Sequence, residues 1–292
     1  MPRYLDPKND LTFKRVFGEH DHLCISLLNA LLPLEKGRQV VKVDYRAGEL
    51  LPLFDGAKNS IVDVRCEDNE GRQFIVEMQM YWTTSFQQRV LLNASKAYVA
   101  QFNKEIKGRD PYRLVKPVYA LNFVNDIFMP DKAAYYHHYA MVNVADTEQR
   151  IDGLTLIFIE LPKFKPDNRA VRKLRDLWLL FLTAIDRGDE QVPPELLEQP
   201  DTNDAVHILE EYSYTRQELE SYDRYIDAIA TEKTLLAGSR EEGHAEGLIE
   251  GGVIRTREIA LSMLKEGFPL ETVAKCSGLA VSEIMGLMKK VK

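Results

Sequence analysis

Apolar and polar positions alternate in two short runs of this chain, 61–65 and 74–79. Alternation with a period of two is typical of a β-strand that is buried on one face. The stretch between the runs, 67–71, is rich in residues that favour turns. The pattern therefore predicts a β-hairpin, and each of its strands carries a carboxylate, Asp63 on the first and Glu77 on the second.

The length of the predicted turn decides which residues face each other across this hairpin. A three-residue loop that ends at Gly71 gives the glycine the positive φ that such loops need, and Asp63 then lies directly opposite Glu77. A two-residue loop, 69–70, would shift the register by one residue and separate the two carboxylates, but it would put a glutamate where a positive φ is wanted. We therefore expect the three-residue loop.

Two carboxylates opposed across a hairpin destabilise a sheet unless a cation or a proton lies between them. A hard divalent cation such as Mg²⁺, which takes oxygen ligands and keeps part of its water shell, suits Asp63 and Glu77. The alternative is structural, because two half-buried strands with polar outer faces would also turn these side chains, with Arg65 and Gln79, to solvent. Spacing alone does not separate a metal site from a solvated face.

Other segments of the chain have helical or strand-like patterns. Apolar residues recur at helical spacing in 10–18, 23–32, 85–105, 169–185 and 204–237. Runs of apolar, β-branched and aromatic residues predict further strands at 40–45, 117–124, 139–144 and 154–161. Strands flanked by helices favour an α/β sandwich.

An acidic segment with several prolines, 188–200, follows these elements and predicts a domain boundary. We expect a core over 1–187, an acidic linker and helix over 188–237, and an all-α module over 238–292.

The C-terminal module has two recognisable patterns. Glycines recur every four residues at Gly243, Gly247 and Gly251, which forms a stripe on a helix where another backbone can approach closely. We expect this stripe to support either a homo-oligomer or docking on the core. Three helical segments follow, 254–265, 270–277 and 281–290, in the outline of a helix-turn-helix. The last of them begins with Ser282 and Glu283 and has no Arg or Asn there to read bases, so we prefer a packing or oligomerisation module over a DNA reader.

Composition narrows the class of protein. The chain has 292 residues, of which 45% are hydrophobic, so it can bury one sizeable core and carry a smaller module. The longest apolar run, 177–182, is too short to cross a membrane, and the polar N-terminus has no export signal. Three cysteines without CxxC spacing favour neither a disulfide framework nor a structural zinc site. We expect a cytoplasmic protein with no membrane partner.

The net charge of −7 is concentrated in one part of the sequence. From Asp186 to Asp223 there are twelve acidic residues and two arginines, a local charge of −10, so the rest of the chain carries about +3. The densest basic stretch is 163–175, with six Lys and Arg residues. It is either a surface that binds phosphates or a solvated helix face.

The order of these residues gives a family resemblance. Asp63 followed by Glu77, Met78 and Gln79 on the next strand resembles the pattern of the PD-(D/E)xK nuclease superfamily, with glutamine where that pattern has lysine. The stretch PKNDLTFK at 7–14, Arg89 and Tyr98 further along, and the glycine-spaced tail are similar to the Rpn family of recombination-promoting nucleases and transposases. The resemblance implies a restriction-endonuclease-like α/β core, with a mixed sheet flanked by helices, and here an all-α C-terminal extension.

The resemblance also implies a site and a reaction. Asp63 and Glu77 would hold Mg²⁺, or Mn²⁺ in its place, with the backbone carbonyl of Met78 as a third ligand. The lysine of the superfamily pattern orients and activates water, and Gln79 keeps its hydrogen bonds but loses the positive charge, so we expect slow turnover or a second ion. The implied function is a metal-dependent endonuclease that hydrolyses DNA and is associated with recombination or mobile elements.

Three further residues are candidates for this site. Asp10 is either an outer-shell catalytic carboxylate or an acidic residue that the start of a helix favours. Lys14 and Arg89 either contact DNA phosphates or are surface charges, and Lys14 is also spaced to pair with Asp10. The alternative function is a non-catalytic interaction or regulatory protein that keeps the nuclease-like core as a scaffold. The retained pair of Asp63 and Glu77 favours the enzyme, because a scaffold would be free to lose two carboxylates that repel each other.

Overall fold

The computed structural model describes residues 3–50, 60–102, 110–166 and 173–291. The chain forms two compact units, Met1–Asp227 and Ala228–Lys292.

The first unit is built around a six-stranded sheet with the strand order β1-β4-β5-β6-β8-β7. Its strands are β1 (Val43–Tyr45), β4 (Val64–Asp68), β5 (Gln73–Gln79), β6 (Val118–Val124), β7 (Tyr136–Asn143) and β8 (Asp146–Glu160). The pairs β5 with β6 and β6 with β8 are parallel, and the other pairs are antiparallel, so the sheet is mixed. Two short strands, β2 (Glu49–Leu50) and β3 (Ser60–Ile61), pair separately.

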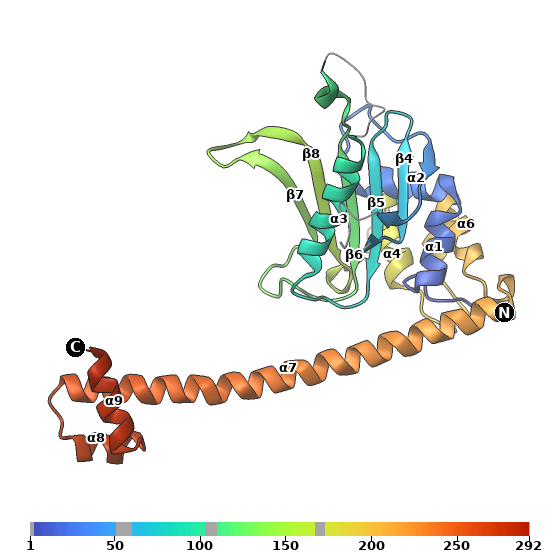
Figure 1. Ribbon diagram of the computed structural model, residues 1–292. Coiled ribbons are helices and arrows are strands. Elements are labelled where there is room, and N and C mark those ends of the chain that lie inside the picture. The colour runs from blue at the N-terminus through green and yellow to red at the C-terminus, as the bar shows by residue number, and fades with distance from the viewer. Residues whose placement is uncertain (1–2, 51–59, 103–109, 167–172, 292) are drawn as a thin grey trace. The chain divides into compact units, whose positions relative to one another are not determined.

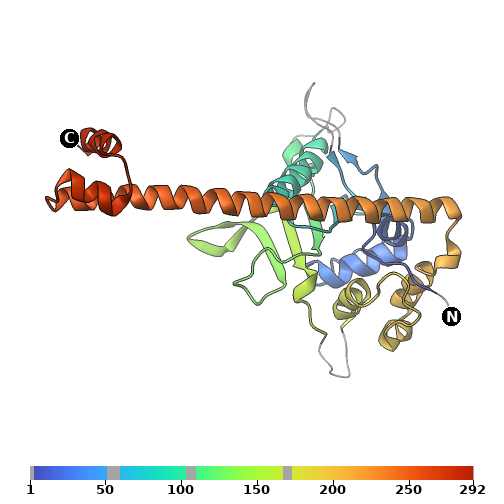
Figure 2. The ribbon, with the colours of Figure 1, turned by 90° about the horizontal axis from the view of Figure 1, so that it is seen from below.

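Helices cover both faces of the sheet (Figure 1). One face carries α3 (Phe86–Ala100), and the other carries α1 (Asp10–Gly18), α2 (Asp21–Leu31), α4 (Leu174–Thr183) and α6 (Pro200–Ile208). In Figure 2 the teal α3 and the blue α1 and α2 lie on opposite sides of the strands. Shorter helical turns are η1 (Pro111–Leu114), η2 (Leu161–Lys163), α5 (Pro194–Glu198) and η3 (Glu211–Ser213). The predicted α/β core, a mixed sheet flanked by helices, is confirmed.

The central strand β5 is buried on both faces, and its alternation decides where Glu77 points. Phe74 and Val76 belong to the core beneath α1, α2 and α4, whereas Ile75 belongs to the core beneath α3. Side chains two residues apart on a strand share a face, so Glu77 follows Ile75 onto the α3 side of the sheet.

Several predicted boundaries differ from the observed ones. The strand predicted over 61–65 is divided, since β3 ends at Ile61, β4 begins at Val64, and Asp63 lies in the bend between them. Strand β8 begins eight residues before the predicted 154. The helix predicted over 204–237 is interrupted, because α6 ends at Ile208 and α7 begins at Arg216. Parts of the helices predicted over 85–105 and 169–185 lie outside the described residues.

The acidic segment that follows residue 187 packs into the core instead of running free as a linker. Leu196 of α5 is fully buried, and so are Ala205, Val206 and Leu209 in and just after α6. The first compact unit accordingly extends to Asp227. The acidic composition of this segment did not predict its burial. The acidic residues leave free an apolar stripe at helical spacing, and this stripe packs against the core.

The second unit has the three predicted helical segments. They are the last part of α7 (Arg216–Lys265), α8 (Leu270–Ser277) and α9 (Val281–Val291), which enclose Ala260, Val273 and Ile284. Among the described residues, a Cβ added at Gly243, Gly247 or Gly251 would meet no atom within 4 Å, and the homo-oligomer stays a prediction. No helix in the described part of the chain is both long enough and apolar enough to cross a membrane.

Candidate active site

The hairpin has the register that the three-residue loop predicts. Val64 pairs with Val76 and Arg65 with Ile75, and continuing this register by one residue places Asp63 opposite Glu77. Gly71 closes the turn with φ of 81°. The positive φ of this one glycine therefore brings the two carboxylates onto the same side of the sheet.

Asp63 is held in its bend from two directions. The N–H of Val62 donates to the Gly48 carbonyl at 3.0 Å, and a Cβ added at Gly48 would lie only 2.5 Å from the Val62 carbonyl oxygen. The Asp63 carboxylate accepts a hydrogen bond from the backbone N–H of Met78 at 2.8 Å, through Oδ2. The side chain therefore reaches across to β5, where Glu77 begins the motif.

Glu77 is a buried carboxylate, with 7% of its surface exposed. Its Oε1 accepts a hydrogen bond from Nδ2 of Asn93 on α3, at 3.2 Å. Burial and the neighbouring charge of Asp63 raise the pKa of Glu77 to about 7, against smaller lowering effects from Asn93 and Arg89. Burial also raises the pKa of Asp63, which the Met78 N–H and Lys14 lower in part. A nearby cation would therefore stabilise the ionised forms of both carboxylates.

The first helix brings Asp10 and Lys14 to the same place. Asn9, whose side chain accepts from the Leu11 N–H at 3.0 Å, caps the helix, so Asp10 is a first-turn residue and not the cap. Lys14 Nζ lies 2.6 Å from Oδ1 of Asp10 and 4.0 Å from Oδ1 of Asp63. The predicted i,i+4 pair is present, and it lies beside the carboxylate pair of the hairpin.

Gln79 and Arg89 form a second pair at the end of β5. Arg89 Nη2 donates to Oε1 of Gln79 at 2.5 Å, and Gln79 Nε2 donates to the Tyr81 carbonyl at 2.8 Å. The Arg89 guanidinium also lies over the Phe86 ring, 4.9 Å from its centroid. Every residue predicted for this site, from α1, the hairpin and α3, therefore lies in one region of the first unit.

The donor set fits a cation that keeps much of its own water. Among the described residues, no group of three or more His, Cys, Asp and Glu side chains could hold a metal ion. Asp63 and Glu77 offer two carboxylates, and Mg²⁺ is commonly held by one or two carboxylates, with waters and substrate phosphates completing its six ligands. The predicted ligation by the Met78 carbonyl stays a prediction.

Asn93 is the functional candidate that the sequence did not reveal. It is 2% exposed and holds Glu77, and its position four residues after Arg89 puts both on one face of α3. The sequence signal that could have identified Asn93 is its place among the apolar positions of the α3 stripe, one helical turn after Arg89.

The residues at the two ends of the basic stretch 163–175, Lys163 and Arg175, form hydrogen bonds with other groups of the protein. Lys163 Nζ contacts Oε2 of Glu160 and the carbonyl oxygens of Met129 and Lys132. Arg175 Nη2 donates to the Tyr135 hydroxyl at 2.7 Å. The arginines at 169 and 172 lie outside the described residues. Lys163 and Arg175 are therefore structural cations and not a phosphate-binding surface.

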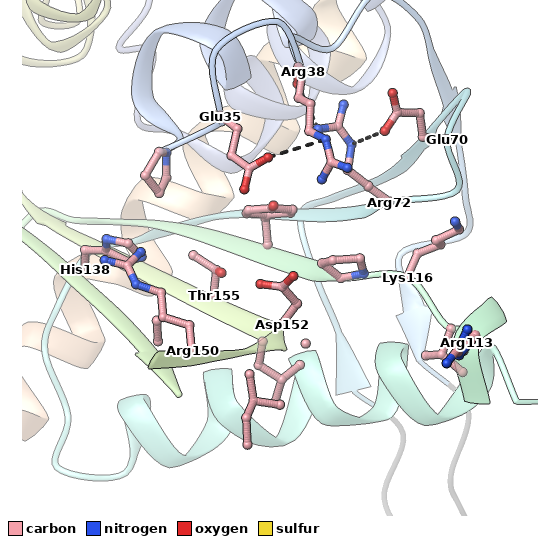
Figure 3. Close-up of a pocket in the computed structure, with 18 residues that line it drawn as sticks. Glu35, Arg38, Glu70, Arg72, Arg113, Lys116, His138, Arg150, Asp152 and Thr155 are labelled. Atoms are coloured by element: carbon pink, nitrogen blue, oxygen red, sulfur yellow. Dashed lines mark hydrogen bonds and ion pairs between the residues drawn. The ribbon is translucent and has the colours of Figure 1, made fainter. Parts of the chain in front are cut away.

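A separate cavity of about 350 Å³ lies near the N-terminal ends of β5 and β6. Figure 3 shows Arg150 and His138 on one side of it and Arg72 and Lys116 on the other. It contains none of the predicted site residues, because Glu77 and Gln79 lie toward the opposite end of β5. The carboxylate site is therefore distinct from this charged cavity.

Comparison with known proteins identifies a family for this chain. A family model described as PD-(D/E)XK nuclease family transposase matches residues 7–238, a span that contains the whole carboxylate site. Neither the search of curated proteins nor that of solved structures finds a match. Since the family model covers most of the sequence, the chain belongs to the PD-(D/E)XK nuclease family transposases.

Proposed function

We propose that this protein is a metal-dependent endonuclease that hydrolyses phosphodiester bonds of DNA in the cytoplasm, in recombination or in the movement of genetic elements. The observation that carries the proposal is the pair of carboxylates opposed across one hairpin, Glu77, which is buried, and Asp63, which is half-buried. Such a pair costs stability unless a cation offsets its charge. Metal binding for phosphodiester hydrolysis would explain why a member of a nuclease family keeps this destabilising pair.

The side chains of the site have separable tasks. Asp63 and Glu77 would hold the ion, while the Met78 N–H and Asn93 fix the two carboxylates in place. Arg89, whose charge acts on both carboxylates, would contact a DNA phosphate. When bound, Mg²⁺ or Mn²⁺ would activate water as a nucleophile and offset charge on the phosphoryl oxygens.

The reaction is the hydrolysis of one phosphodiester bond. The oxygen of a water forms a bond to phosphorus while the bond from phosphorus to the 3′ oxygen breaks. The departing oxygen takes up a proton, which leaves a 3′-hydroxyl and a 5′-phosphate.

Plasmid cleavage tests the proposal. Wild type, Asp63→Ala and the matched control Asp44→Ala are compared with Mg²⁺, with Mn²⁺ and with EDTA. Asp44 is an exposed carboxylate on β1 that pairs with Lys42, so its removal controls for a lost charge and for contaminating nucleases. We expect metal-dependent cleavage by wild type and Asp44→Ala, and none by Asp63→Ala. Equal cleavage by all three folded proteins, or by none, would favour the scaffold function instead.

A further inference from the structure

Gln79 stands where the superfamily pattern has lysine, and each end of its amide makes a hydrogen bond. Oε1 accepts from Arg89 and Nε2 donates to the Tyr81 carbonyl. Turning the amide toward a water would break both of these hydrogen bonds. A carboxamide also has no charge with which to stabilise an attacking water. Gln79 is therefore a structural residue in this site.

An ammonium group is nevertheless present, and it comes from another element. Lys14 of α1 has its Nζ 4.0 Å from Oδ1 of Asp63. Among the described residues, Lys14 is the only cation within ion-pair distance of that carboxylate. Asp10, one helical turn earlier, holds the same Nζ at 2.6 Å.

The helix that carries Lys14 is firmly fixed on the core. Phe13 and Phe17 are fully buried, with ring centroids 5.0 Å apart. The Thr12 hydroxyl donates to the Asp6 carbonyl at 2.6 Å. Because the backbone of α1 is held so closely, the Lys14 side chain starts from a defined position, as a site residue on a rigid element should.

Arg89 is the competing cation. Its guanidinium is bound to Gln79 and lies over Phe86. These contacts suit it to stabilise charge on a phosphate, but turning it toward an attacking water would break them. The lysine ammonium is compact, has three rotatable donors and is about 40% exposed, so it can turn toward an incoming substrate.

We propose that Lys14 supplies, from the first helix, the ammonium that the superfamily pattern places at the position of Gln79. It orients the attacking water and stabilises the charge that develops on the phosphoryl oxygens. Asp10 is then a positioning residue that holds Lys14 ready beside Asp63, which gives the outer-shell carboxylate a definite task. This inference rests on the proposed function.

Lys14→Met tests it, with Lys42→Met as the matched control. Lys42 is an exposed lysine that also pairs with an aspartate, and it lies outside the site. DNA affinity is measured by fluorescence anisotropy with Ca²⁺, so that binding is read separately from turnover, and cleavage is measured in single turnover with Mg²⁺ at saturating protein. For Lys14→Met we expect cleavage about 100-fold slower, as for loss of one charge-stabilising donor, with the dissociation constant for DNA and the melting temperature nearly unchanged.

A rescue experiment distinguishes a role of Lys14 in orienting the attacking water from a simple contact with a DNA phosphate. Lysine is placed at the position it has in the superfamily pattern by Gln79→Lys, together with Arg89→Gln so that two cations do not face each other. We expect Lys14→Met/Gln79→Lys/Arg89→Gln to cleave at least about tenfold faster than Lys14→Met/Arg89→Gln, a gain of roughly 1.4 kcal/mol.

Three results would overturn the assignment. They are cleavage by Lys14→Met at the wild-type rate, a loss confined to DNA affinity, and no recovery in the folded triple variant. A wild type that does not cleave at all is a different result, because it removes the proposed function itself.

Discussion

At the scale of single residues, the main feature of the site is the buried Glu77 carboxylate, whose ionised form destabilises the folded protein. Glu77 is 7% exposed, and Asn93 is its hydrogen-bond donor from α3. The protein must neutralise this carboxylate with a proton or with a cation. Which of the two it uses should depend on pH.

The stability of the metal-free protein should fall as pH rises toward neutrality. The pKa of Glu77 is about 7 in the folded state against 4.5 for the free side chain. A raised pKa means that the stabilising contribution is fully present below about 4.5 and is lost as the pH rises through about 7. Between pH 5 and 7.5 we expect a loss of about 2 kcal/mol in the free energy of unfolding, measured with urea in EDTA.

Two comparisons isolate Glu77 from other titrating groups. Glu77→Gln cannot ionise, so it should lack this part of the pH dependence. Added Mg²⁺ should recover stability at pH 7.5 and much less at pH 5, because it binds the ionised pair. An identical pH profile for wild type and Glu77→Gln would show that Glu77 is not the buried acid described here.

At the scale of elements, the hairpin shows what the sequence could predict. Its register follows from local chemistry, because Gly71 is the one loop residue that takes a positive φ readily. The helices at 10–18 and 270–277 were equally readable from their apolar spacing and stop signals. These local patterns predict that Asp63, Glu77 and Gln79 lie near one another, and the roles of these residues stay a prediction.

Other features depended on contacts between distant segments. The bend at Asp63 is set by Gly48, which lies fifteen residues earlier, just before β2, and no local sequence pattern predicts this contact. The burial of α5 and α6 depends on partners in α2 and α4. Lys14 reaches Asp63 only because α1 packs beside β4. Such placements come from tertiary packing, which single-sequence periodicity does not contain.

Gly48 gives the prediction at this scale. In Gly48→Ala the new Cβ would lie 2.5 Å from the Val62 carbonyl oxygen, so the backbone next to Asp63 must move. We expect a loss of about 1–3 kcal/mol in the free energy of unfolding and weaker Mg²⁺ binding. Gly18→Ala is the control, because its Cβ would meet only Val64, at an ordinary 3.6 Å. Urea unfolding and Mg²⁺ titration by calorimetry compare the two, and equal behaviour would contradict the crowding argument.

At the scale of the molecule, the first compact unit is closed by its own N-terminal segment. Tyr4 exchanges backbone hydrogen bonds with Gly188 and Asp189, and the Leu5 N–H donates to the Leu209 carbonyl. The next residues continue to α7, where the Tyr222 hydroxyl accepts from the Asp6 N–H at 3.0 Å. The segment that leads into α1 is therefore held by residues about 200 positions later.

Two truncations test the extent of this unit. A chain ending at Asp227 keeps the small apolar cluster of Leu5, Tyr214 and Tyr222, whereas one ending at Thr215 loses Tyr222. We expect the longer chain to unfold as the first unit of the full protein does, and the shorter one to lose at least about 3 kcal/mol, the usual cost of removing a buried aromatic side chain. Calorimetric unfolding measures both, and equal stability would place the end of the unit before α7.

The same N-terminal segment affects when the protein becomes complete during its synthesis. Asp10 and Lys14 are made first, but the contacts that hold the segment before them come from residues 182–222. Asp63 and Glu77 are likewise present long before those contacts can form. A nascent chain therefore carries every residue of the carboxylate site well before the residues that fix its N-terminal segment have been made.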